Sequence, residues 1–185
     1  PPHRTSSAAS DVYKRQEIYP TAEHIFKAVS KTHIRCDGAY AVLALITGHG
    51  LLAFRDNNGI RPLSIGIRKG ENRDEYVIAS EDALFISLGF TKLRDVDPGE
   101  AVFIDKNGKL FSQQCADNPI KRPCIFEYVY FSRPDSKIDE ISVYKARMRM
   151  GKKLAEQIKK TKPDHDIDVV LSLIHISEPT RLSWI

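Results

Sequence analysis

The chain has 185 residues, 42% hydrophobic and 28% charged, which is ordinary for a soluble globular protein of one domain or slightly more. No apolar run reaches the length of a bilayer span and no signal-peptide pattern opens the chain, so we expect a cytoplasmic protein with no membrane partner. Three cysteines without a CxxC pair argue against a disulfide framework and fit a reducing compartment. The net charge of +4 is a weak indication of an anionic partner.

The two ends of the chain are related to each other as DNA. One back-translation of DVYKRQ (11–16), GAT GTG TAT AAG AGA CAG, has a reverse complement that encodes LSLIHI (171–176). We therefore interpret residues 1–16 and 171–185 as translated adapter DNA, the alternative being an ordinary N-terminal tail and a genuine strand. Without these ends, which carry four basic and two acidic residues, the net charge falls to +2 and no nucleic-acid partner is expected.

The next part of the sequence predicts one helix and a hairpin. In TAEHIFKAVSKT (21–32), apolar residues recur at helical spacing, and Thr21 is suited to cap the N-terminus. The apolar stretch 39–47, the GHG turn and LLAFR (51–55) predict a β-hairpin. DNNGIRP (56–62) predicts a tight turn, because Asn-Gly tolerates the positive φ that such turns require.

More strands are expected after this turn, with one short helix between them. LSIGIR (63–68) and EYVIAS (75–80) predict strands, and residues 81–89 predict a helix capped by Ser80. Residues 95–114 predict a turn, a strand, a KNGK hairpin turn and another strand. About six mostly antiparallel strands with little helix indicate an α+β domain built from antiparallel β layers.

The pattern changes beyond these strands. Residues 114–123 are polar with prolines and predict a linker, and FEYVYFSRPDS (126–136) predicts an apolar strand broken by its proline. Residues 141–160 predict a long helix with a Lys/Arg face. A strand expected within 166–170 then marks the start of an α/β domain with a parallel sheet.

No catalytic constellation can be assembled from these segments alone. His49 lies in the GHG turn and is interpreted as a turn residue rather than a base. No histidine has metal-ligand spacing with another histidine or cysteine. Arg55 and Asp56 either hold a carboxylate or phosphate group or, as we favour, stabilise their own turn. Cys124 is a nucleophile, a metal ligand or, the interpretation that we favour, a small buried hydrophobe.

Two further features have both a functional and a structural interpretation. The basic face of the 141–160 helix suits anionic lipid or nucleic acid, but a solvated helix face explains it as well. Arg133, Asp135 and Ser136 form a turn around a proline that either contacts a ligand or caps the next helix. The residues alone therefore predict an antiparallel β domain, a hinge and the start of a second domain.

Longer stretches of the sequence resemble one enzyme family. GAYAVLALITGHGLLAFRDNNGIRPLSIG (38–66), EYVIASEDAL (75–84), LRDVDPGEAVFI (93–104) and QCADNPIKRPCIFEYVYFSRPDS (114–136) resemble glutamine phosphoribosylpyrophosphate amidotransferases. FRDNNGIRPL alone is similar to the wider group of N-terminal-nucleophile glutaminases, whereas FEYVYFSRPDS following QCADNP is specific to this family. The resemblance covers residues 17–170 in order.

The resemblance implies an activity and a division into domains. Enzymes of this family transfer glutamine-derived ammonia to phosphoribosylpyrophosphate (PRPP) with Mg²⁺ present, giving 5-phosphoribosylamine in the first committed step of purine synthesis. It implies that residues 17–113 are the second half of the glutaminase domain, 114–123 the linker and 124–170 the start of a type I phosphoribosyltransferase domain. The implied substrates are glutamine and PRPP, and the implied state is a homo-oligomer.

The resemblance also implies that this chain lacks the catalytic residues. The family's nucleophile is a cysteine at the processed N-terminus, whose α-amine titrates at about 8 and takes the thiol proton. Position 1 here is Pro1. The paired acids and the small-residue loop that hold PRPP, and the Mg²⁺ ligands, have no match either. We therefore expect the 185-residue chain itself to be inactive.

Two residues receive roles from the resemblance. Tyr130 matches a tyrosine near the domain interface and the ammonia path. Cys124 matches an iron–sulfur ligand of one branch, but that branch needs three further cysteines in a C-terminal part, so we do not expect a cluster. The alternatives are a fragment of a hexosamine-forming or asparagine-forming glutaminase, and a non-enzymatic interaction module that binds through its basic helix.

Overall fold

The computed structural model describes residues 20–169 of the chain. The ends interpreted as adapter translation, 1–16 and 171–185, lie outside the described residues, as does the last residue of the strand expected at 166–170. A first compact unit ends at Arg147 and a second begins at Met148.

Strands make up most of the regular structure of the first unit. The helices of the described residues are α2 (Ala22–Arg35), α3 (Ala83–Ser87), the π-helix η1 (Glu127–Phe131) and α4 (Val143–Thr161). The strands are β1 (Ala41–Ile46), β2 (Gly50–Arg55), β3 (Ser64–Arg68), β4 (Glu75–Ala79), β5 (Thr91–Asp95), β6 (Glu100–Asp105), β7 (Leu110–Gln114), β8 (Lys137–Ile138) and β9 (Ile141–Ser142).

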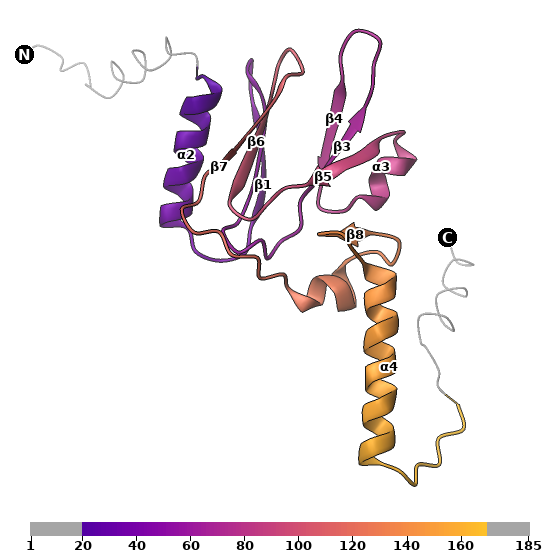
Figure 1. Ribbon diagram of the computed structural model, residues 1–185. Coiled ribbons are helices and arrows are strands. Elements are labelled where there is room, and N and C mark those ends of the chain that lie inside the picture. The colour runs from indigo at the N-terminus through magenta and orange to yellow at the C-terminus, as the bar shows by residue number, and fades with distance from the viewer. Residues whose placement is uncertain (1–19, 170–185) are drawn as a thin grey trace, which may run out of the picture. The chain divides into compact units, whose positions relative to one another are not determined.

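Two antiparallel sheets form the body of this unit (Figure 1). One has the strand order β1-β2-β6-β7 and the other β4-β3-β5, while β8 and β9 pair as a separate small hairpin. Helix α2 covers one face of the four-stranded sheet, and α3 packs against the three-stranded sheet. This arrangement of antiparallel layers with helices confirms the expected α+β class.

Alternation along the strands explains why the unit has two hydrophobic cores. In β2, Leu52 and Phe54 point toward α2, whereas Ala53 between them points toward the other sheet. The first core, under α2, contains Ile25, Phe26, Val29, Leu52, Phe54, Ala101, Phe103 and Cys115. The second core contains Ala53, Leu63, Ile65, Val96 and Val102. The central strands β2 and β6 are therefore buried on both faces of the four-stranded sheet.

Several local predictions are confirmed. Thr21 caps α2: its side-chain oxygen accepts a hydrogen bond from the His24 amide, and the His24 ring accepts one from the Thr21 amide. The hairpins β1–β2 and β6–β7 form as expected, and both turns contain a glycine with positive φ, Gly48 at 77° and Gly108 at 81°. The helix after β4 also forms, but Ser80 does not cap it; its N-cap is Asp82, which makes no side-chain capping bond.

The predicted strand at 126–136 is wrong. Residues Glu127–Phe131 form a π-helix instead, closed by a hydrogen bond from the Ser132 amide to the Glu127 carbonyl at 3.0 Å. Aromatic and β-branched residues favour strands, but no strand of the described residues pairs with this stretch. Strand β5 went unpredicted, because TKLRD has little hydrophobic alternation and is held by pairing with β3.

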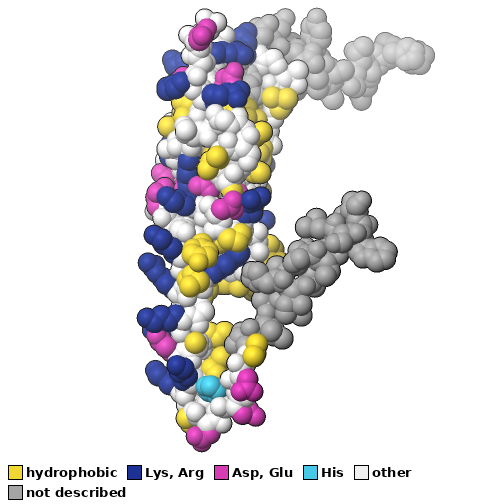
Figure 2. Space-filling view, turned by 90° about the vertical axis from the view of Figure 1, so that its right-hand side faces the viewer, with side chains coloured by type: hydrophobic (Ala, Val, Ile, Leu, Met, Phe, Trp, Pro, Cys, Tyr) yellow, Lys and Arg dark blue, Asp and Glu magenta, His cyan; other side chains and the backbone are white. Residues whose placement is uncertain are grey.

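The second unit, considered by itself, has no buried side chain among residues 148–169. It contains most of helix α4, followed by an irregular stretch in which the expected strand is not formed up to Val169. Figure 2 shows Lys and Arg side chains along one side of this helix and hydrophobic side chains beside them. No helix within residues 20–169 is both long and apolar enough to cross a membrane.

Candidate functional site

The turn 56–62 is organised by the buried carboxylate of Asp56. One oxygen, Oδ1, accepts from the amides of Asn58 and Ile60 at 3.0 Å each, and Oδ2 accepts from the amide of Arg61 at 3.1 Å. The side chain is 0% exposed, so both oxygens are committed to the backbone of the turn. The structural interpretation of Asp56 is therefore the one that the geometry supports.

Arg55, at the end of β2, uses all five of its N–H donors within the protein. Its Nε donates to the Arg61 carbonyl at 2.7 Å, Nη1 to the Val96 carbonyl at 2.8 Å and Nη2 to the Gly59 carbonyl at 2.7 Å. The two remaining donors bind the carboxylate of Asp139. Arg55 is 1% exposed, so it holds parts of this chain together and has no donor left for a ligand.

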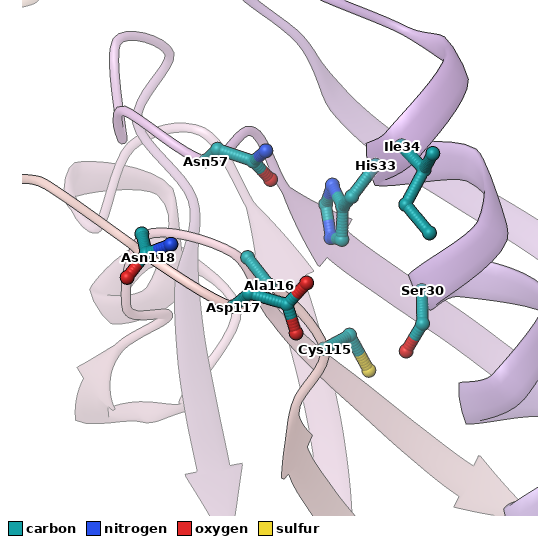
Figure 3. A pocket seen from close by; sticks show the side chains of 8 residues that line it. All are labelled: Ser30, His33, Ile34, Asn57, Cys115, Ala116, Asp117 and Asn118. Atoms are coloured by element: carbon teal, nitrogen blue, oxygen red, sulfur yellow. The ribbon is translucent and has the colours of Figure 1, made fainter.

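One hollow beside the turn lies between α2 and the segment after β7 (Figure 3). It has a volume of about 250 Å³ and is lined by Ser30, His33, Ile34, Asn57, Cys115, Ala116, Asp117 and Asn118. The side chains of Cys115 and Asp117 face those of Ser30 and His33 across it. The hollow is small and most of its lining side chains are polar, which suits a small hydrogen-bonding ligand better than an apolar one.

Two titratable groups of this hollow are perturbed by burial. Burial lowers the pKa of His33, and the charge of Asp56 and the Gly99 carbonyl offset part of that shift. The His33 Nδ1 lies 2.8 Å from the Tyr40 hydroxyl, which fixes the ring. Burial raises the pKa of the Cys115 thiol. A buried thiol with a raised pKa is a poor nucleophile, so the hollow lacks an activated cysteine.

A second hollow lies on the other side of the turn. It measures about 400 Å³ and is lined by Ala39, Tyr40, Ala41, Arg61, Pro62, Ser80, Glu81, Glu127 and Phe131. Arg61 Nη1 contacts Glu127 Oε1 at 2.7 Å, and the Arg61 guanidinium lies 5.6 Å from the centre of the Phe131 ring. Burial raises the pKa of Glu127, although the charge of Arg61 opposes that shift. The hollow is therefore lined by two acidic residues, one arginine and the aromatic rings of Tyr40 and Phe131.

The structure places Tyr130 beside this second hollow rather than in its lining. The Tyr130 ring is 77% exposed and packs edge-on against Phe131, with ring centres 5.5 Å apart. Cys124 is half-buried, three residues before Glu127 of the lining. Within residues 20–169, no group of three or more His, Cys, Asp or Glu side chains is placed to hold a metal ion.

The other candidate residues have structural partners. The His49 amide donates to the Ile46 carbonyl at 2.9 Å in the β1–β2 turn. Arg133 pairs with Asp135 at 3.0 Å, and the Ser136 hydroxyl donates to Glu81 at 2.7 Å. Sequence reasoning did not single out Glu81, Glu127 or Asp139. All three are acids whose partners lie far away in the chain, and no local pattern marks such residues.

Comparison with known proteins decides the family. No family model matches the chain. It is 55% identical over 174 residues to the amidophosphoribosyltransferase of Pseudomonas aeruginosa, covering 94% of this chain and 35% of that enzyme. It is 57% identical over 157 residues to the Escherichia coli enzyme of the same name, covering 84% and 31%. The chain belongs to the amidophosphoribosyltransferase family.

Solved structures agree with this assignment. The glutamine PRPP amidotransferase of Bacillus subtilis, solved with ADP and GMP, matches with a TM-score of 0.62 and 36% identity, over 80% of this chain and 34% of that one. The resemblance found from the sequence is thus confirmed. The chain spans about a third of the length of the two curated amidophosphoribosyltransferases named above, 35% and 31%.

Proposed function

We propose that this chain is the middle part of an amidophosphoribosyltransferase, which transfers ammonia from glutamine to PRPP and yields 5-phosphoribosylamine, glutamate and pyrophosphate. The observation that carries the proposal is identity of 55% over nearly the whole chain to an enzyme named for this reaction. In the complete protein, glutamine and PRPP are the substrates, and purine synthesis is the pathway served. We place the enzyme in the cytoplasm as a homo-oligomer.

In this proposal the chain contains parts of both domains that catalyse the half-reactions, and the linker between them. Residues 17–113 belong to the glutaminase domain, 114–123 to a linker and 124–170 to the start of the phosphoribosyltransferase domain. The linker is well ordered by backbone hydrogen bonds, since the Ile120 amide donates to the Asn57 carbonyl at 3.1 Å and the Arg122 amide to the Asn58 carbonyl at 2.7 Å. A linker fixed in this way favours a defined path between the domains over a flexible tether.

We infer that the exposed aromatic surface of η1 faces the route that ammonia takes between the two sites. Tyr130 and Phe131 are 77% and 56% exposed, and Phe131 forms the rim of the second hollow. Exposed aromatic side chains next to a polar hollow suit a passage that excludes water along one wall. Tyr130 would line this passage and would not take part in bond making.

We infer that other parts of the complete enzyme hold the metal of the reaction. Mg²⁺ in the complete enzyme would neutralise charge on the pyrophosphate that leaves PRPP. This inference rests on the family resemblance, because the paired acids and the small-residue loop that hold PRPP in this family have no match in the sequence. We do not propose an iron–sulfur cluster on Cys124, since the three further cysteines that such a cluster needs would lie in a C-terminal part of the complete enzyme.

The proposal is tested with the complete reading frame, recovered from the source DNA and expressed. The purified protein should release pyrophosphate from PRPP only when glutamine or ammonia is supplied, and glutamate only when glutamine is supplied. The 185-residue chain, purified in parallel, should do neither, because it lacks a catalytic cysteine with a free α-amine. A folded complete protein that uses glutamine with a sugar phosphate or aspartate instead of PRPP would overturn the proposal.

A further inference from the structure

Residues 133–142, here called the entry segment, lead from η1 into α4 and are fastened to the β layers. Glu81, just after β4, accepts hydrogen bonds from the Arg133 amide at 2.8 Å and from the Ser136 hydroxyl at 2.7 Å. The adjacent Asp82 accepts from the amide of the residue after Ser136 at 2.9 Å. These bonds fix the direction in which the chain enters α4.

A buried ion pair joins the entry segment to the centre of the first unit. Nη1 and Nη2 of Arg55 each bind one carboxylate oxygen of Asp139, at 3.0 and 3.1 Å. The side chains are 1% and 4% exposed, and the two residues are 84 positions apart in the sequence. A bidentate pair of this kind fixes orientation as well as distance.

The backbone at Asp139 and Glu140 has an unfavourable conformation, which we relate to the contact between Asp139 and Arg55. Asp139 has φ 49° and Glu140 has φ 64°, both in the left-handed region that residues other than glycine seldom adopt. Glu140 is 82% exposed and its nearest ion-pair partner, Lys92, is 3.9 Å away, so its side chain does not explain the strain. Strain of this kind persists where surrounding contacts determine it, and Asp139 supplies those contacts.

Asp139 also binds the segment proposed as the linker. Lys121 Nζ lies 3.1 Å from Asp139 Oδ1, and the Lys121 side chain is half exposed. Burial by itself would raise the pKa of Asp139, but the hydrogen bonds and charges of Arg55 and Lys121 outweigh it and lower that pKa. The carboxylate is therefore charged at neutral pH and holds the end of β2, the 114–123 segment and the entry segment together.

We propose that the Arg55–Asp139 pair is a positioning latch that couples glutamine hydrolysis to ammonia use. This inference rests on the proposed function. The latch sits where the chain passes from the proposed glutaminase part to the proposed transferase part, and the donors of Arg55 are all used within the protein. Its role is to hold the entry segment against the β layers, so that the passage proposed beside η1 keeps the alignment that lets ammonia pass without escaping to water.

The stoichiometry of the complete reaction distinguishes a loss of coupling from a loss of catalysis. In the complete reaction, one glutamine gives one glutamate and one ammonia, and that ammonia displaces one pyrophosphate. A misaligned passage leaves both chemical steps intact but lets ammonia escape between them. A loss confined to the glutamine-dependent reaction is therefore the signature of the latch, and a general loss is not.

The test uses the complete enzyme with Asp139→Asn, since asparagine keeps the size of the side chain and tolerates positive φ but removes the charge. We expect glutamate release and ammonia-dependent pyrophosphate release to stay near those of the unchanged enzyme. Glutamine-dependent pyrophosphate release should fall about tenfold, because a shift of about 1 Å in alignment has effects of that size or larger. The ratio of glutamate to pyrophosphate should rise accordingly.

The matched control is Glu140→Gly, which relieves strain in the same turn and leaves the ion pair in place; its ratio should stay that of the unchanged enzyme. If Asp139→Asn does not fold, Lys121→Ala removes only the outer partner of the carboxylate and should raise the ratio in the same direction. Equal loss of all three rates, or an unchanged ratio in a folded variant, would refute the latch. An unchanged enzyme without PRPP-dependent activity would refute the proposed function instead.

Discussion

At the scale of single residues, buried polar side chains connect separate segments of the first unit through hydrogen bonds and ion pairs. Asp56 and Arg55 are neighbours in the sequence, yet one organises its own turn and the other reaches into the entry segment. His33, in the last turn of α2, is buried with its ring stacked on Tyr40 and edge-on to Phe54. Each such group stabilises the fold only in the charge state that its surroundings accept.

His33 should make the stability of the 185-residue chain depend on pH. Burial lowers its pKa in the folded state, so at pH below about 6.5 the unfolded state binds more protons and stability falls as pH drops. Melting temperatures at about pH 7.5 and about pH 5.5 measure this. His33→Asn should show a smaller drop than the unchanged chain.

The comparison between variants isolates His33 from other groups. Glu127 has a raised pKa, so its protonation favours the folded state as pH falls and acts in the opposite direction. His165→Asn changes an exposed histidine and is the control, with the same pH response as the unchanged chain. If His33→Asn keeps the full loss of melting temperature, His33 does not cause it.

At the scale of elements, the three-stranded sheet depends on a close approach between β3 and α3. The register between β3 and β5 shifts at Gly66, and Phe85 of α3 is 0% exposed above it. A Cβ at Gly66 would lie 2.7 Å from Val77 Cγ1 and 2.9 Å from Phe85 Cδ2. A glycine inside a strand at such a point allows the helix to pack directly on the backbone.

Gly66→Ala should therefore destabilise the first unit. Overpacking a buried contact of this kind costs about 1–3 kcal/mol, which would appear as a lower melting temperature and an earlier urea transition. Gly151→Ala is the matched control, because nothing lies within 4 Å of its Cβ position and it sits inside a helix. That variant should be neutral or slightly stabilising, by up to about 1 kcal/mol. A Gly66→Ala chain as stable as Gly151→Ala would show that α3 moves aside freely.

At the scale of the whole molecule, the two compact units differ in how much they bury. The first has two hydrophobic cores, whereas no residue from 148 to 169 is buried. The helical residues of the second unit therefore depend on backbone hydrogen bonds and local side-chain pairs such as Lys153–Glu156 at 2.9 Å. A helix segment of this length without a packed face is marginal in water.

Amide hydrogen exchange should reveal this difference in the chain. Amides of 148–161 should exchange orders of magnitude faster than those of α2, whose Ile25, Phe26 and Val29 are buried. The first turn of α4 should exchange more slowly than the rest of that helix. The reason is that the Val143 and Tyr144 amides donate to the Ser136 and Pro134 carbonyls, at 3.1 Å each. Equal protection along the whole of α4 would contradict this expectation.

The sequence by itself determined the family and most of the local elements of the first unit. Thr21 and the hairpin glycines act through neighbours in the chain, so their patterns could be interpreted without a structure. Long motifs such as FEYVYFSRPDS identified the family even though that stretch forms a π-helix, because family resemblance does not depend on knowing the local conformation.

Only the tertiary structure decided which distant residues meet. The pairing of Arg55 with Asp139, the Arg61–Glu127 contact and the pairing that makes a strand of TKLRD all join segments far apart in the chain. A single sequence carries no period or spacing that specifies such contacts. Their energy comes from hydrogen bonds and charge attraction between the partners, which must outweigh the cost of removing those groups from water. That balance depends on how the layers pack.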